Sequence, residues 1–249
     1  GIRDALGSRG LGDVYKRQIS AVLLPVFSGM DKGDGMSNET LVVWNSALLK
    51  SAKLIFPMLI FSVFFAEPIM TCMYGDIYAQ SSIYFVIKNL SGLFYIIPFY
   101  PIILAIGKTN SYANAHMIAA FMIVMAEYVV CKTFDSAVYV AITSELCKLF
   151  KIWLLLRVIA NYAHKKITEL LPPRPMTILI MISVLASLPP FLLLDFLNMN
   201  KFIVLFVCLG FFLVDYYVLC WICKVTYRDI AGGFLKNKSR LNAVVKILP

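Results

Sequence analysis

Charged residues are scarce in this chain. Asp, Glu, Lys and Arg make up 15% of its 249 residues, whereas soluble domains carry about 25%. Apolar side chains make up 60% of the sequence, and the mean hydropathy is +0.80. This balance excludes a soluble globular domain of this length and predicts a membrane protein.

The residues that usually carry catalysis are also few. The two histidines, His116 and His164, stand apart, and the six cysteines lack the paired, loop-borne pattern of a disulfide scaffold. Cys220 and Cys223 have the spacing of a redox or zinc motif, but they lie in an apolar stretch beside Trp221 without further ligands. No Ser/His/Asp grouping or metal cluster is present in the sequence. We therefore expect no enzymatic activity, no metal site and no cofactor.

Long apolar runs dominate what is present, and there are six of them. Most have the roughly 20 residues that a helix needs to cross a hydrocarbon core of about 30 Å. The third run is short, but residues 111–132 span if Asn114, His116 and Glu127 are tolerated inside a bundle. The sequence therefore predicts an all-α, polytopic membrane helical bundle. The runs are 54–73, 83–106, 117–130, 138–156, 176–196 and 202–225.

The basic residues set the orientation, because Lys and Arg in short connectors mark the cytoplasmic side. When the connector before residue 54 is placed inside, fourteen basic residues fall inside and only Lys132 and Lys201 fall outside. The net charge of +9 then reflects topology and attraction to anionic lipid headgroups, so no nucleic-acid partner is expected. The inside residues are Lys32, Lys50, Lys53, Lys108, Arg157, Lys165, Lys166, Arg174, Lys224, Arg228, Lys236, Lys238, Arg240 and Lys246.

The start of the chain differs in character from the rest. Residues 1–18 are polar and Gly-rich, and Asp13 to Gln18 look like a translated sequencing adapter, which favours a non-native extension over an ordinary cytoplasmic one. Residues 19–30 are apolar but too short to span, so we interpret them as the end of a truncated transmembrane helix. The remaining polar segments are expected on the cytoplasmic side. They are a loop at 31–53, a basic loop at 163–175 and the tail at 227–249.

Several turns resemble those of polysaccharide biosynthesis proteins, the O-antigen and capsule oligosaccharide flippases. The resemblance rests on Leu-Pro-Val-Phe-Ser at 24–28, Met-Tyr-Gly-Asp-Ile-Tyr-Ala-Gln-Ser at 73–81 and Ala-Ile-Gly-Lys-Thr at 105–109. The Leu-Pro entry at 171–172 is similar too. The chain departs from the pattern at 133–136, where Thr-Phe-Asp-Ser replaces a glycine that often joins two spans.

This resemblance implies a fold and a function. The family has two six-helix lobes around a central cavity, so residues 54–162 would supply four helices of the second lobe and 176–226 a peripheral helix pair. The protein would flip lipid-diphosphate-linked oligosaccharide across the bacterial inner membrane, with its carboxyl terminus in the cytoplasm. Its partners would be that substrate, membrane lipids, a coupling ion (H⁺ or Na⁺) and the amino-terminal lobe of the same protein.

Other functions remain open at this point. A cation-coupled multidrug extruder would use the same scaffold. An integral-membrane glycosyltransferase or polymerase of the same pathway would need a charged catalytic loop, for which the outer connectors are too short. A membrane scaffold without transport activity is a further alternative.

Ionisable residues inside the apolar runs are the candidate site residues, because a charge at the bilayer centre costs at least about 2.5 to 3.5 kcal/mol. They are Lys88, Glu127, Glu145, Lys148, Lys151 and Asp215. Two interpretations are open: the charges neutralise one another between helices, or they line a substrate cavity.

Glu145 and Lys148 are three residues apart and can meet on one helix face. For a cavity, we expect Lys88 and Lys148 to attract the diphosphate and Glu127 or Glu145 to carry a coupling proton. Lys88 can alternatively anchor its helix at the membrane interface.

Pro98 and Pro101 fall inside the second run. Each removes a helix hydrogen bond, so the pair predicts a bend.

Overall fold

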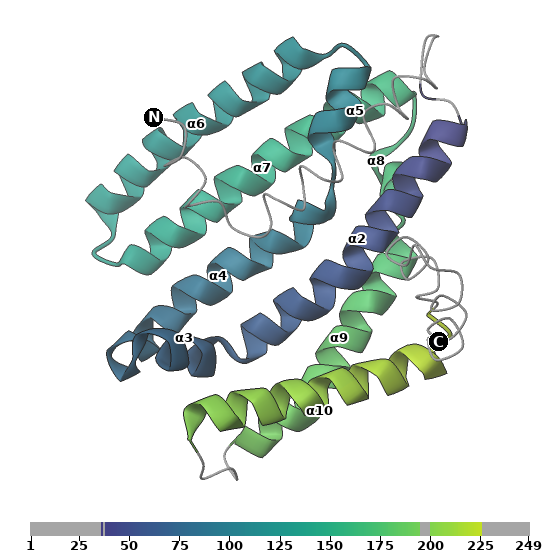
Figure 1. Cartoon of the computed structure of the whole chain (residues 1–249). Coiled ribbons are helices and arrows are strands. Elements are labelled where there is room, and N and C mark those ends of the chain that lie inside the picture. The colour runs from purple at the N-terminus through teal and green to yellow at the C-terminus, as the bar shows by residue number, and fades with distance from the viewer. Residues whose placement is uncertain (1–35, 37, 195–199, 226–249) are drawn as a thin grey trace, which may run out of the picture. The chain divides into compact units, whose positions relative to one another are not determined.

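The chain is helical throughout the part that the structure describes. The computed structural model describes residues 36, 38–194 and 200–225, and within them it has nine α-helices, two 3-10 segments and no strands (Figure 1). The α-helices are α2 (Asn38–Phe64), α3 (Ala66–Tyr74), α4 (Ser82–Gly92), α5 (Phe99–Ala105), α6 (Thr109–Thr133), α7 (Ala137–Ala163), α8 (Ile167–Leu170), α9 (Pro173–Leu193) and α10 (Lys201–Ile222). The 3-10 segments are η2 (Asp76–Ser81) and η3 (Leu93–Ile96).

The helices form two compact units. Unit 1 comprises residues 1–48 and 94–172, and unit 2 comprises residues 49–93 and 173–249. The division falls within α2, between Leu48 and Leu49. Unit 2 therefore groups α9 and α10 with α3, α4 and the second part of α2. The sequence had instead suggested that residues 176–226 form a separate peripheral helix pair.

Unit 1 is built on the α6–α7 hairpin. The two helices run antiparallel along their length, α5 packs against both of them, and α8 packs against the end of α7 (Figure 1). In this unit the indole N–H of Trp44 donates a hydrogen bond of 2.9 Å to the main-chain carbonyl of Leu170. Both side chains are fully buried. This contact ties the start of α2 to α8.

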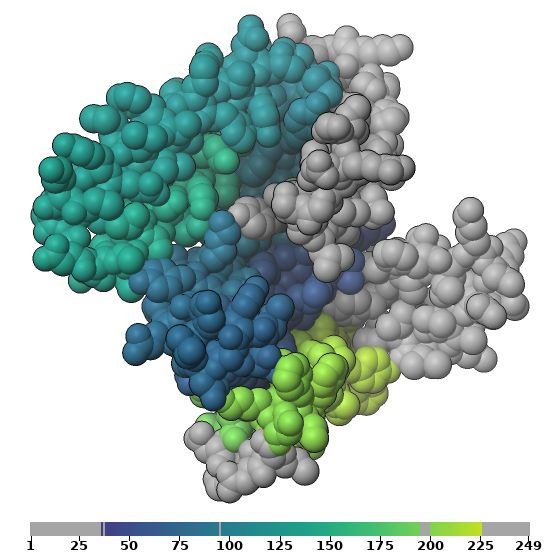
Figure 2. All heavy atoms as spheres, turned by 60° about the vertical axis from the view of Figure 1, so that its left-hand side comes forward, coloured from purple at the N-terminus to yellow at the C-terminus, as the bar shows by residue number. Residues whose placement is uncertain are grey.

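Unit 2 is held by aromatic and small side chains. The rings of Phe61 and Phe65 stack with centroids 4.4 Å apart, and Phe61 also meets Phe212 of α10 at 5.0 Å. Figure 2 shows α3 and α10 side by side, in agreement with their packing contacts. The buried core consists of Phe61, Phe65, Ile182, Ala186, Val204, Cys208, Phe212, Tyr216 and Cys220.

Four helices, α2, α6, α9 and α10, are long and apolar enough to cross a membrane. In α9 the polarity is inverted relative to a soluble helix, because Ser183 and Ser187 are fully buried while Met181 and Leu192 are at least 60% exposed. The hydroxyl of Ser187 donates to the carbonyl of Ser183 at 2.8 Å, which satisfies a polar group within the helix. These helices indicate a multi-pass membrane protein.

The six apolar runs of the sequence do not all become single long helices. The run at 83–106 is divided into α4, η3 and α5, with Pro98 immediately before α5. The run at 138–156 forms part of the 27-residue helix α7, whose apolar stretch is interrupted by Glu145, Lys148 and Lys151. The run at 54–73 is divided at Phe65 between the end of α2 and α3. The runs at 117–130, 176–196 and 202–225 supply α6, α9 and α10, which with α2 qualify as spans by length and composition.

The prediction of a loop at 31–53 was wrong from Asn38 onward, because α2 begins at that residue. Thr40, Trp44, Leu48 and Ala52 recur every four residues, and all four are fully buried. Polar residues such as Lys50 and Lys53 hide this helical period from a search for unbroken apolar runs.

Other expected segments have different outcomes. The basic loop expected at 163–175 contains α8, and α9 already begins at Pro173. The segments 1–18, 19–30 and 227–249, and with them the motif at 24–28, lie outside the described residues.

Candidate functional site

The charged candidates of unit 1 are positioned by α7, whose two ends are well defined. Ser136 before the helix is extended, with φ −127° and ψ 121°. At the other end His164 adopts the left-handed conformation, with φ 51° and ψ 35°. The N–H of Lys165 then donates to the carbonyl of Ala160 at 3.2 Å, which closes the turn after the helix. The charged residues of α7 thus sit on a continuous helix of defined register.

Glu145 and Lys148 form an ion pair on α7. The ammonium nitrogen of Lys148 lies 2.6 Å from Oε1 of Glu145. The pair is largely shielded, since the side chains are 11% exposed for Glu145 and 28% for Lys148. The predicted contact between residues three apart is confirmed, and the two charges neutralise each other within one helix and not between helices. A buried pair of this kind offsets part of the cost of removing both charges from water.

The remaining candidates of unit 1 lie along the same hairpin. Glu127 is half-buried on α6, and Lys151 is half-buried on α7. Together with Glu145 and Lys148 they place ionisable groups at several levels along the two helices.

Lys88 and Asp215 belong to unit 2, whereas the charged residues of the α6–α7 hairpin belong to unit 1. Lys88 lies exposed on α4, and its main-chain carbonyl accepts a hydrogen bond of 2.9 Å from the hydroxyl of Ser91. Asp215 is half-buried on α10.

Pro98 and Pro101 lie where the chain leaves η3 and enters α5. Pro98 directly precedes the helix with φ −83° and ψ 67°, which is not a helical conformation. Pro101 is buried in the first turn of α5, where a missing N–H removes no helix hydrogen bond. The N–H of Phe99 donates to the carbonyl of Ile97 at 3.0 Å across the interruption. The run at 83–106 is therefore interrupted at these prolines.

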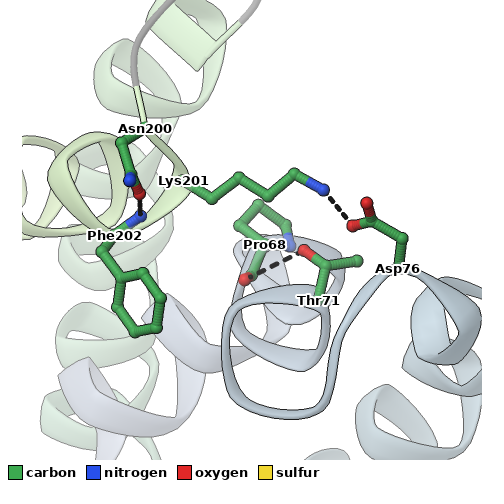
Figure 3. Close-up of polar contacts among 6 residues, drawn as sticks. All are labelled: Pro68, Thr71, Asp76, Asn200, Lys201 and Phe202. Atoms are coloured by element: carbon green, nitrogen blue, oxygen red, sulfur yellow. Dashed lines mark hydrogen bonds and ion pairs between the residues drawn. The ribbon is translucent and has the colours of Figure 1, made fainter.

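A second polar cluster, in unit 2, was missed by the sequence analysis. The ammonium group of Lys201, the first residue of α10, pairs with Oδ1 of Asp76 at the start of η2. Figure 3 shows the Lys201 side chain reaching toward Asp76 past the turn that carries Pro68 and Thr71. The hydroxyl of Thr71 donates to the carbonyl of Pro68 at 3.3 Å. Both charged residues were expected in outer connectors, but their pairing across 125 positions has no signal in the sequence.

The start of α10 is fixed by its own cap. The side-chain oxygen of Asn200 accepts a hydrogen bond of 3.1 Å from the N–H of Phe202 (Figure 3). Such a cap satisfies one of the unpaired donors of the first turn. It fixes the backbone on both sides of Lys201 and so helps to aim that side chain.

A pocket of about 730 Å³ lies beside this ion pair. Glu67, Thr71, Asp76 and Lys201 supply its polar groups. Its remaining walls are Phe64, Pro68, Ala79, Phe191, Leu192, Leu194 and Val204.

The cysteines show no shared site. All six lie within the described residues, and none of them is in a disulfide bond. Cys220 is buried in the core of unit 2, whereas Cys223 is exposed at the end of α10. Among the residues that the structure describes, no group of three or more His, Cys, Asp or Glu side chains is arranged to hold a metal ion.

Comparison of the chain with models of protein families, with curated proteins and with solved structures found no match. The resemblance of the turn motifs therefore stays a prediction.

Proposed function

We propose that this chain is the second lobe, with its following helix pair, of a transporter that flips lipid-diphosphate-linked oligosaccharide across the bacterial inner membrane. The observation that supports this proposal most is the ion pair of Glu145 and Lys148 within the α6–α7 hairpin. Ionisable residues at membrane depth are by default candidates for a transport pathway. The turn motifs at 73–81 and 105–109, which resemble those of the oligosaccharide flippases, support this substrate class.

One long-range polar contact supports the proposed topology. The ion pair joins Asp76 and Lys201, which are 125 positions apart, and both lie in connectors that the distribution of basic residues places outside.

Such a transporter must replace the water that hydrates the polar groups of its substrate. The hydroxyl groups and the diphosphate of the substrate would lose their hydrogen bonds in the hydrocarbon core. A polar groove that opens alternately to each membrane face supplies substitutes. No covalent bond breaks, so the protein acts as a carrier and not as an enzyme.

The charged residues have specific roles in this proposal. Lys148 exchanges its contact with Glu145 for the substrate diphosphate, because a phosphate and a carboxylate compete for the same ammonium group. The released Glu145, or Glu127 on the facing helix, takes up the coupling proton. Lys88 provides a further cation for the diphosphate. Pro98, directly before α5, and Pro101, in its first turn, mark the place where the helical run at 83–106 is interrupted.

The test is a translocation assay with the full-length protein in liposomes that contain a fluorescent lipid-linked oligosaccharide. We expect protein-dependent loss of the label from the accessible leaflet, and a loss at least tenfold slower for Lys148→Met than for the parent. Arg157→Met is the matched control, since its guanidinium lies over the exposed ring of Trp153, 5.4 Å from the ring centre. Absence of translocation under H⁺ and Na⁺ gradients alike would contradict the proposal. Loss of drug resistance on gene deletion, with no translocation of sugar lipid, would favour the drug extruder.

A further inference from the structure

The pocket beside Asp76 and Lys201 has the size and the mixed lining of a ligand site. Its volume of about 730 Å³ falls within the roughly 300 to 1,000 Å³ of small-molecule sites. Polar side chains from α3, η2 and α10 converge on it, and apolar side chains form the rest of its walls. All of its lining residues belong to unit 2, so the pocket is a feature of one compact unit.

The charges in the pocket select among classes of ligand. Glu67 is exposed, and the side chains of Asp76 and Lys201 are 77% and 55% exposed. The two carboxylates disfavour an anion, and the ammonium group of Lys201 disfavours a second ammonium group beside it, because like charges repel. A metal ion lacks a suitable set of side chains, since the described residues include no cluster of three potential ligands. A neutral ligand that both donates and accepts hydrogen bonds fits what remains.

The walls narrow the class further. Glu67 and Asp76 accept hydrogen bonds, Lys201 donates them and the hydroxyl of Thr71 does both. Phe64 and Phe191 supply apolar surface instead, and their rings contact each other edge to face with centroids 5.7 Å apart. Aromatic and aliphatic surfaces beside charged hydrogen-bonding groups suit a ring that carries hydroxyl groups at its rim and C–H bonds on its face. A sugar has this character.

We propose that this pocket, which we call the outer pocket, binds a neutral sugar ring of the translocated oligosaccharide on the periplasmic side. The choice of a glycan rests on the proposed function, whereas the position of the pocket and its charges come from the structure. The ligand sits against the Asp76–Lys201 pair, and its hydroxyl groups bond to both charged side chains. Glu67 binds a further hydroxyl group. The outer pocket thereby holds the glycan as it arrives outside.

The experiment measures binding of small glycosides to the full chain in lipid nanodiscs by saturation-transfer difference NMR, with empty nanodiscs as background. The probes are methyl β-glucoside, its anionic relative methyl β-glucuronide and its cationic relative methyl β-glucosaminide. We expect a signal from the neutral glycoside that exceeds both charged relatives. Glu67→Gln and Lys201→Met are each expected to weaken the binding of the neutral glycoside by about tenfold, the effect of losing one charged hydrogen bond.

Lys132→Met is the matched control, because Lys132 is the other basic residue expected outside. It lies on α6 over the ring of Tyr128, 5.8 Å from the ring centre, and does not line the outer pocket. Lys132→Met should leave binding unchanged. Asp76→Asn provides a second variant that keeps the shape of the side chain, so a folding defect in one variant does not decide the result.

Three results would overturn the proposal: no signal above empty nanodiscs, a stronger signal from either charged relative, or equal losses for Lys132→Met and Lys201→Met. Translocation of sugar lipid without glycoside binding would contradict the proposed role of the outer pocket and would leave the proposed transport function standing. Glycoside binding that depends on Glu67 and Lys201, without any translocation, would support the role of the pocket and contradict the transport function.

Discussion

Lys201 at the start of α10 pairs with Asp76 at the start of η2, although 125 positions separate them. One of the two basic residues expected on the outer side is therefore neutralised by an acidic partner on the same side. The other, Lys132, lies in the last turn of α6, where a cation interacts favourably with the helix dipole. Lys132 and Lys201, the two basic residues expected on the outer side, thus each have a favourable local electrostatic interaction.

The Asp76–Lys201 pair is expected to contribute little to stability. Its side chains are 77% and 55% exposed, and exposed ion pairs contribute about 0.2 to 1 kcal/mol. A double-mutant cycle with Asp76→Asn and Lys201→Met, measured by equilibrium unfolding in mixed micelles, should give a coupling energy within that range. The coupling should fall as salt is raised. A coupling above about 2 kcal/mol, independent of salt, would show that the pair is shielded from water.

Trp44 is expected to be an anchor of unit 1. Trp44→Phe removes the donor to the buried carbonyl of Leu170 and leaves part of the indole volume empty, so we expect a loss of about 1 to 3 kcal/mol in the free energy of unfolding. Trp153→Phe is the matched control, because Trp153 is 43% exposed, and it should change stability by less than about 0.5 kcal/mol. Equal effects for the two variants would be inconsistent with the observed contact.

Neutralisation within the α6–α7 hairpin can be tested by removing one charge and then both. Glu145→Leu leaves Lys148 without the carboxylate that pairs with it, and breaking a buried pair in this way costs about 3 kcal/mol. The double variant Glu145→Leu, Lys148→Leu should recover most of that loss, because two apolar side chains replace two compensated charges. Equilibrium unfolding of the parent and the two variants gives the comparison. If the double variant were as unstable as Glu145→Leu, the pairing would not be what makes the charges tolerable.

His164 ends α7 in the left-handed conformation, with φ 51°. This conformation costs an L-residue about 1 kcal/mol and costs glycine almost nothing. His164→Gly should therefore raise the free energy of unfolding by up to about 1 kcal/mol. Ala163→Gly, one position earlier and still helical, should lower it by about 0.5 to 1 kcal/mol. A loss of stability in both variants would mean that the His164 side chain makes a contact worth more than the strain.

Composition alone was sufficient to predict the class of fold. Long apolar runs gave the four helices that can span a membrane, because length and hydropathy are properties of the local sequence. The pair of Glu145 and Lys148 was predictable for the same reason, since a spacing of three residues brings two side chains together on any helix. The interruption near Pro98 also follows from local chemistry.

Most of what escaped prediction depends on tertiary packing. The start of α2 is different: it was missed because Lys50 and Lys53 interrupt its apolar residues, so the recurrence of buried positions every four residues, Thr40 and Trp44 among them, does not appear as an unbroken run. The contacts of Trp44 with Leu170 and of Asp76 with Lys201 join distant segments, and no local pattern encodes them. The outer pocket is lined by residues from segments far apart in the chain, so it could not have been found from the sequence.

The topology can be tested directly with two native cysteines. Cys131 near the end of α6 and Cys223 after α10 are both exposed. The six-span topology expected from the sequence, in which α7 also crosses, places them on opposite faces of the membrane. A membrane-impermeant maleimide added to intact spheroplasts should label Cys131 and should label Cys223 only after permeabilisation, with Cys131→Ser and Cys223→Ser identifying each site. Labelling of Cys223 from outside, or of both cysteines equally before permeabilisation, would contradict a chain threaded through the membrane with its carboxyl terminus in the cytoplasm.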